Sequence, residues 1–164
     1  MRLWNLTMAV AAVLTLAAPA AAHVSVAPKE GKPGSQTMIK IHVGHGCDGK
    51  PTTAVRFDVP RSFTMAHPQE VDGWNASIKT SGGRITRITW TVIGAPPETA
   101  PDFEVHVGLP GAEGRLYLPI TQTCGKTVVR WTAKAGPHGK VPQNPAPEFN
   151  VTMYLATPPV IHMH

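Results

Sequence analysis

Most of the chain beyond residue 23 consists of short segments in which apolar residues alternate with other residues. In segment 37–43, Ile39, Ile41 and Val43 occupy every second position. This period of two puts the three side chains on one face of a β-strand and leaves His42 on the solvent face. Similar patterns, bounded by turn residues, predict further strands over 24–26, 52–59, 76–79, 84–92, 102–108, 116–124, 126–133 and 149–155. We expect segment 63–72, which lacks the pattern, to be irregular.

Proline and glycine residues separate these segments and argue against long helices. The sequence contains 17 prolines and 15 glycines in 164 residues, and both residue types interrupt helices. Ser81-Gly82-Gly83 lies between two of the predicted strands, which is typical of a tight hairpin turn. Many short strands joined by such turns predict an all-β protein with an antiparallel β-sandwich fold.

The first 22 residues have the features of a secretory signal peptide. Arg2 precedes an apolar run over 3–18, and the small residues Ala20 and Ala22 occupy positions −3 and −1 of a cleavage site. We therefore expect export to the periplasm or the extracellular space, with a mature chain that begins at His23. No other apolar segment is long enough to cross a bilayer, so we expect no transmembrane span in the mature chain.

The length and charge of the mature chain exclude several classes of protein. Removal of residues 1–22 would leave 164 − 22 = 142 residues, for which we expect one β-sandwich domain over 23–135 and a proline-rich extension over 136–164. The charge would be 14 basic minus 10 acidic residues, or +4. Because the basic residues are scattered and no nucleic-acid recognition motif is present, we expect no nucleic-acid partner.

Hydrolase and phosphate-binding motifs are also missing, so we do not expect an enzyme.

The sequence contains two cysteines, Cys47 and Cys124. In an oxidising compartment an isolated pair most simply forms one disulfide, and we expect that pairing here. The alternative is a metal site in which the Cys47 thiolate acts together with His45, which would require the cysteines to stay reduced outside the cytoplasm.

A histidine at the start of a mature chain offers metal-binding chemistry that an internal histidine lacks. The free α-amino group and Nδ1 of His23 could together form a chelate ring with one metal ion. The metal must first displace a proton from the amino group, whose ordinary pKa is about 8. An amine, an imidazole and a carboxylate are donors that Cu(II) accepts in tetragonal geometry. Zinc more often takes four tetrahedral protein donors. The candidate ion is therefore Cu(II), unless His23 is simply an arbitrary first residue.

Several motifs together resemble the YcnI-like family of exported copper-binding domains. Its mature proteins begin with a histidine in a segment of the form H-V-x-V-x-P-K-E, which matches residues 23–30 here. The other matching segments are G-H-G-C-D-G at 44–49, P-T-T-A-V at 51–55, Gly73-Trp74, R-I-T-W at 87–90, Q-T-C at 122–124 and Arg130-Trp131. The resemblance covers most of the mature chain, from His23 to Trp131.

This resemblance implies a β-sandwich that binds one Cu(II) through a single-histidine brace. The implied ligands are the amine and ring of His23, an acidic side chain and a nearby tryptophan, which is Trp131 in this sequence. The family position of the acidic ligand aligns here with Arg56, so the sequence departs from the pattern. The remaining candidates for this ligand are Glu30, His45 and Asp58.

We therefore expect an exported copper-binding protein that acts in copper trafficking or homeostasis, together with an exported copper chaperone or cuproenzyme as partner. The alternative is a copper-dependent oxidative enzyme in which His45 or His106 completes an N-terminal histidine brace. A third reading is a structural sandwich without a metal. The end of the chain, His162-Met163-His164, is either a weak copper site or a loose terminus.

Overall fold

The computed structural model describes residues 23–134, 136, 140 and 142–155, and within these residues the chain forms twelve β-strands and no helix. None of the described segments could therefore cross a membrane as a helix. The expected signal peptide and the His-Met-His end lie outside the described residues.

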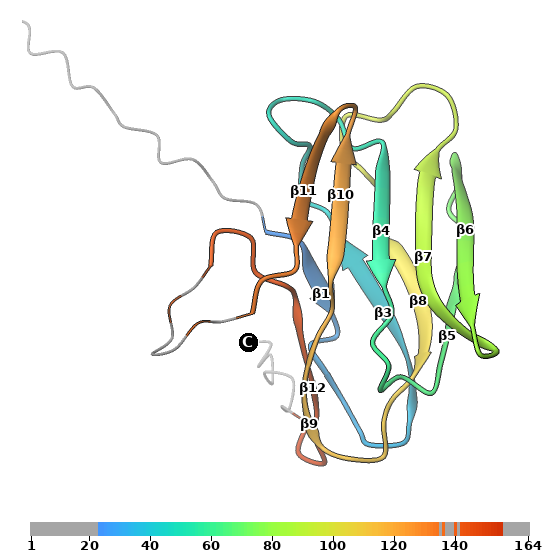
Figure 1. Ribbon diagram of the computed structural model, residues 1–164, viewed down its shortest axis with the longest axis vertical. Coiled ribbons are helices and arrows are strands. Elements are labelled where there is room, and N and C mark those ends of the chain that lie inside the picture. The colour runs from blue at the N-terminus through green and yellow to red at the C-terminus, as the bar shows by residue number, and fades with distance from the viewer. Residues whose placement is uncertain (1–22, 135, 137–139, 141, 156–164) are drawn as a thin grey trace, which may run out of the picture.

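Two sheets form the layers of a sandwich. The four-stranded sheet has the order β1 (Ser25–Ala27), β3 (Gln36–His42), β8 (Phe103–Gly108), β5 (Met65–Pro68). The five-stranded sheet has the order β11 (Thr127–Trp131), β10 (Ile120–Cys124), β4 (Ala54–Asp58), β7 (Arg84–Val92), β6 (Trp74–Ser81). All neighbours in both sheets are antiparallel. The edge strands β1 and β11 lie on the same side of the molecule (Figure 1).

A third, smaller sheet lies toward one end of the sandwich (Figure 1). It has the order β2 (Glu30–Gly31), β12 (Glu148–Val151), β9 (Gly114–Tyr117). β12 follows the expected domain end at residue 135, yet its Phe149 is fully buried in the core. A Cβ atom on Gly31 would lie 2.6 Å from Leu109 Cδ1 and 3.1 Å from Phe149 Cζ, so a larger residue here would force the buried Leu109 side chain to shift.

The core confirms the alternation read from the sequence. Ile39 and Ile41 of β3 are fully buried, whereas His42 is exposed as expected. At the centre, the ring of Phe103 lies 4.9 Å from that of Trp74 and 5.1 Å from that of Trp90, measured between centroids. Aromatic contacts of this kind add to the burial of apolar area that stabilises the sandwich. The all-β sandwich prediction is confirmed.

The hairpin prediction is also confirmed. Strands β6 and β7 meet at Gly82-Gly83, and both glycines have positive φ angles, 56° and 74°. Two adjacent residues with positive φ form the type I′ turn, whose twist matches that of antiparallel strands.

Two segments differ from the expectation. The segment 63–72 was expected to be irregular, but it contains β5, which pairs with β8 at the edge of the four-stranded sheet. β5 buries only Ala66, so it is too short to show a period of two. The segment 116–124 was expected to be one strand, but β9 ends at Tyr117 and β10 begins at Ile120. Pro119 lies between them, and a proline cannot donate a ladder hydrogen bond.

Candidate metal centre

The edge strands β1 and β11 bring His23 and Trp131 together. His23 immediately precedes β1 and is exposed, whereas Trp131 at the end of β11 is 8% exposed. Their ring centroids are 6.0 Å apart, and the ring planes meet at 66°, an edge-on contact. The first described residue of the chain therefore lies against a nearly buried indole.

Gln122 fixes the position of this indole. Trp131 Nε1 donates a hydrogen bond to Gln122 Oε1 at 3.2 Å. Gln122 Nε2 donates in turn to Thr52 Oγ1 at 2.9 Å and to the His45 carbonyl oxygen at 2.7 Å. The Gln122 side chain is almost completely buried, so these bonds satisfy polar atoms that water cannot reach. Gln122 therefore links Trp131 to the loop that carries His45.

Sequence reasoning did not single out Gln122 as a functional residue, although a signal was present. Ile120, Gln122 and Cys124 occupy the inward positions of β10 and are all buried. A glutamine between two apolar inward residues is unusual, because a buried amide costs free energy unless it is hydrogen-bonded. This signal predicts a specific buried hydrogen-bond network.

The disulfide prediction is confirmed. Cys47 and Cys124 form a disulfide with a Cα–Cα distance of 5.7 Å. It ties the loop between β3 and β4 to the end of β10, and the Cys47 amide also donates a hydrogen bond to Cys124 Sγ. Neither cysteine is free, so the alternative of a Cys47 thiolate acting with His45 in a metal site is wrong.

His45 lies on this tied loop and offers one free ring nitrogen. Its Nδ1 is 2.7 Å from the Gly46 carbonyl oxygen. A carbonyl oxygen can only accept, so Nδ1 carries the proton and Nε2 carries the lone pair. Metal-binding histidines typically have this arrangement, in which the second ring nitrogen donates to a carbonyl or carboxylate oxygen. The ring is exposed.

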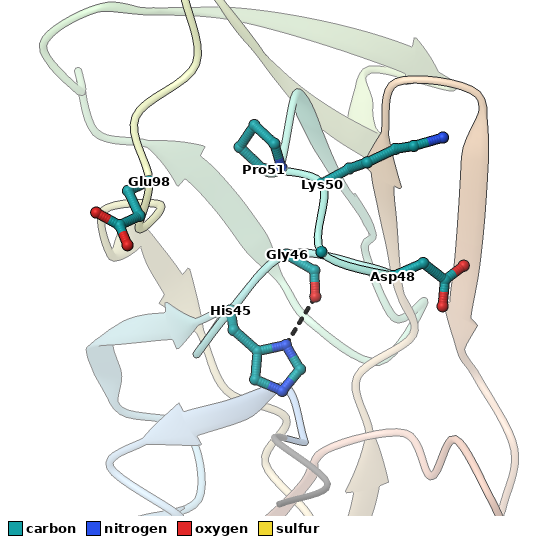
Figure 2. A pocket seen from close by; sticks show the side chains of 7 residues that line it. His45, Gly46, Asp48, Lys50, Pro51 and Glu98 are labelled. Carbon is teal, nitrogen blue, oxygen red and sulfur yellow. Dashed lines mark hydrogen bonds between the residues drawn. The ribbon is translucent and has the colours of Figure 1, made fainter. Parts of the chain in front are cut away.

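The same loop borders a depression of about 390 Å³ that includes Asp48, Lys50 and Glu98. Figure 2 shows that these side chains point in different directions, and that the His45 ring points away from both carboxylates. No common point is therefore surrounded by their polar atoms, and this depression does not form a metal centre.

Asp58 is placed on the outer face of the five-stranded sheet. Its neighbours in the chain, Phe57 and Val59, are buried. Asp58 Oδ1 accepts a hydrogen bond from Arg87 Nε at 2.7 Å, and Oδ2 lies 3.0 Å from Arg56 Nη2. The arginine at the family's acidic position thus pairs with Asp58, and no described contact brings Asp58 to His23.

Glu30 lies on β2 opposite Asn150 of β12. Asn150 and Lys29, the residue before Glu30, line the same depression as His23. A carboxylate that sequence reasoning missed, Glu148, lines the same 340 Å³ depression as His23, but it pairs with Arg115 at 3.5 Å.

The described side chains alone do not make a complete metal site. Among residues 23–134, 136, 140 and 142–155, no three His, Cys, Asp or Glu side chains lie together as a metal-binding group. An N-terminal amine would be an additional donor at His23. Together with the His23 ring and His45 Nε2 it would provide the nitrogen-rich donor set that Cu(II) prefers, so the residues present fit this ion.

Replacing Gln122 with leucine should lower the free energy of unfolding by about 1–3 kcal/mol, because Trp131 Nε1, the Thr52 hydroxyl and the His45 carbonyl each lose a partner. Urea unfolding measures the loss, and the indole N–H resonance of Trp131 should move. The control is Thr121→Val, since the buried Thr121 hydroxyl has no hydrogen-bond partner among the described residues. A larger loss in the control would contradict this role of Gln122.

Replacing Asp58 with asparagine should leave Cu(II) affinity unchanged, because the carboxylate serves two arginines on the outer face. These pairs are partly exposed, so stability should fall by only about 0.2–1 kcal/mol and less at high salt. Isothermal titration with Cu(II) measures the affinity. A tenfold or greater loss of affinity would instead assign Asp58 to the metal centre.

Comparison with known proteins agrees with this fold. The family described as "Domain of unknown function (DUF1775)" matches residues 23–151. Among solved structures, the chain is similar to an uncharacterized protein from Nocardia farcinica with an immunoglobulin-like fold, at 26% identity and a TM-score of 0.68. The match covers 79% of this chain and 97% of that one. No curated protein matches. The chain belongs to the DUF1775 family, the YcnI-like family that its motifs indicated.

Proposed function

We propose that the protein is an exported copper-binding protein that holds one Cu(II) ion at His23 as the first residue of the mature chain. The observation that carries the proposal is the placement of the exposed His23 ring against Trp131, 6.0 Å away, at the meeting point of two sheet edges. The family match also begins at residue 23, where the expected cleavage would expose the amine.

The proposed site combines a chelate formed by His23 with the indole of Trp131 beside it. The amine and Nδ1 of His23 would bind the ion in one chelate ring, in the tetragonal geometry that Cu(II) accepts. The indole of Trp131 is held by its bond to Gln122, so it presents a fixed aromatic surface beside this ring. An aromatic surface shields a cation from solvent on one side and attracts it when the ring face is presented.

His45 is the best supported further ligand among the candidates. Its Nε2 carries a free lone pair, because Nδ1 donates to Gly46. The loop that holds it is tied to β10 by the disulfide and joined to Trp131 through Gln122. Asp58, by contrast, is paired with two arginines.

Export and a role in copper trafficking or homeostasis belong to the same proposal. The Cys47–Cys124 disulfide supports an oxidising compartment, either the periplasm or the extracellular space. A site at an exposed chain end suits an ion that is passed on, because a partner can reach it without the sandwich opening. The partner would be an exported copper chaperone or a cuproenzyme.

A competition titration with a Cu(II) chelator tests the proposal. The mature chain, with His23 confirmed as its first residue by mass spectrometry, is compared with a chain carrying one alanine before His23. We expect one equivalent of Cu(II) on the mature chain and an affinity at least about 100-fold lower on the extended chain, or about 2.8 kcal/mol. His45→Asn should cost about tenfold. Equal affinities of the mature and extended chains would contradict the proposal.

The availability of His45 Nε2 also supports a second candidate, a copper-dependent oxidative enzyme with two histidines at the metal. Fold and donor set alone do not establish catalysis. Copper-loaded protein incubated with a reductant and oxygen would consume oxygen above the level of free copper if this function is correct. A rate equal to that of the His23→Ala variant would exclude it.

A further inference from the structure

A row of three side chains that can bind metals crosses the outer face of the four-stranded sheet. His106 of β8 pairs directly with Met38 of β3 on one side and with His67 of β5 on the other. Met38 is 37% exposed, His67 is exposed and His106 is half-buried. Residues paired in register in an antiparallel sheet point to the same face, so the three side chains share this surface.

A second methionine joins the row because position 108 is a glycine. Met65 of β5 pairs with Gly108 of β8, two residues beyond His106 on the same face. A Cβ atom on Gly108 would clash with Thr64 Oγ1 and lie 2.9 Å from Met65 Cγ. The Thr64 and Met65 side chains therefore lie over β8 in the space that a larger residue at 108 would fill. Two imidazoles and two thioethers thus gather around one strand: Met38, Met65, His67 and His106.

The spacing of these residues suits a single ion above β8. Directly opposed residues have Cβ atoms about 4.5–5.5 Å apart. Side chains from β3 and β5 can therefore reach an ion held by His106 in the middle strand. Among the described residues, neither the His67 nor the His106 ring makes a hydrogen bond, so both rings are available as ligands.

The charged side chains on the same face are engaged with one another. Lys40 Nζ lies 3.5 Å from Glu104 and 3.6 Å from Asp102, and His42 Nδ1 lies 2.7 Å from Asp102. These charged residues lie on the side of His106 that is away from Gly108. The donors left around His106 are therefore soft sulfur and borderline imidazole nitrogen.

We infer that this face is a second metal site, specific for Cu(I), formed by Met38, Met65, His67 and His106. Thioether ligands select Cu(I), and imidazole binds copper well, whereas magnesium and calcium require oxygen ligands. The site shares no residue with the proposed Cu(II) site at His23. It therefore goes beyond the proposed function and does not depend on it.

An anaerobic Cu(I) titration against a chromophoric chelator tests the site. The background is the full mature chain with His162→Asn, Met163→Leu and His164→Asn, since these residues could bind Cu(I) themselves. We expect one equivalent of Cu(I) in this background. His106→Asn and the pair Met38→Leu with Met65→Leu should each weaken binding at least about tenfold. Matched controls outside the group of four, His42→Asn at the end of β3 and Met153→Leu, should bind as the background does.

Two further results distinguish this site from the site at His23. His23→Asn should keep the Cu(I) equivalent while losing high-affinity Cu(II) binding. Loss of Cu(I) binding with His23→Asn, but not with His106→Asn, would overturn the inference.

A measurement without substitutions covers the case in which a variant does not fold. Ag(I), a redox-silent substitute for Cu(I), is added to unmodified ¹³C-methyl-methionine protein. The Met38 and Met65 methyl resonances should shift with one equivalent, while that of Met153 stays in place. Unchanged Met38 and Met65 resonances would equally overturn the inference.

Discussion

Replacing Cys47 and Cys124 together with serine should lower the free energy of unfolding by about 4.5 kcal/mol. The two cysteines are 77 residues apart, and a loop of this length loses about that much closure entropy from the unfolded chain when it is cross-linked. Urea unfolding of the variant, compared with the oxidised protein, measures the loss. Because the disulfide holds the loop of His45, Cu(II) affinity should fall in the same variant.

The oxidised protein treated with a reductant under native conditions is the matched control for this prediction. It should show the same loss of stability as the serine variant, since both remove the same covalent link. A loss below about 1 kcal/mol in both would contradict the role of the disulfide. The Gln122–His45 hydrogen bond and the short Cys47–Lys50 bridge would then be sufficient to hold the loop.

Replacing Phe103 with alanine should destabilise the protein by about 3–5 kcal/mol. Phe103 is fully buried and its ring contacts those of Trp74 and Trp90, which come from the opposite sheet. The substitution removes the transfer free energy of a phenyl ring and leaves a cavity between the two sheets. Chemical unfolding measures the loss, with the slope against denaturant expected to stay constant.

Two controls separate the cavity from the loss of any large side chain. Phe103→Leu keeps most of the volume and should cost less than about 1.5 kcal/mol. Ile78→Ala removes a side chain that is 53% exposed on β6 and should cost no more than about 0.5 kcal/mol. If Phe103→Ala cost as little as Ile78→Ala, the aromatic cluster would not be the centre of the core.

The strands that sequence reasoning predicted best are those with several inward residues of their own. β3 buries Ile39 and Ile41, and β8 buries Phe103, Val105 and Val107. Each strand is long enough to show the period of two without its neighbours. The hairpin at Gly82-Gly83 was predictable for a different reason, since its turn chemistry is local.

The third sheet could not be predicted in the same way. β2 has only two residues, and its partner β12 is more than a hundred residues away in the chain. Pairing at such a distance depends on the arrangement of the whole sandwich, and no local pattern records it. The edge strand β5 was missed because it has one buried residue and is too short to show a period of two.

The candidate site, like the fold, was only partly predictable from the sequence. The chemistry of His23 follows from the residue type and the cleavage pattern, and the disulfide follows from the compartment. The start of β1 and the end of β11 lie close together, which brings Trp131 to His23, and this placement depends on the order of strands in two sheets. Sequence reasoning named Asp58 as a candidate ligand, but its pairing with Arg87 across β4 and β7 depends on the register of these strands.

The most direct measurement is the electron paramagnetic resonance spectrum of the mature protein with one equivalent of Cu(II), with His23 confirmed as the first residue. We expect a single tetragonal signal with nitrogen couplings, and its loss when one alanine precedes His23, because the extension removes the free amine. Identical spectra from the mature and extended chains would contradict a copper site at the N-terminus.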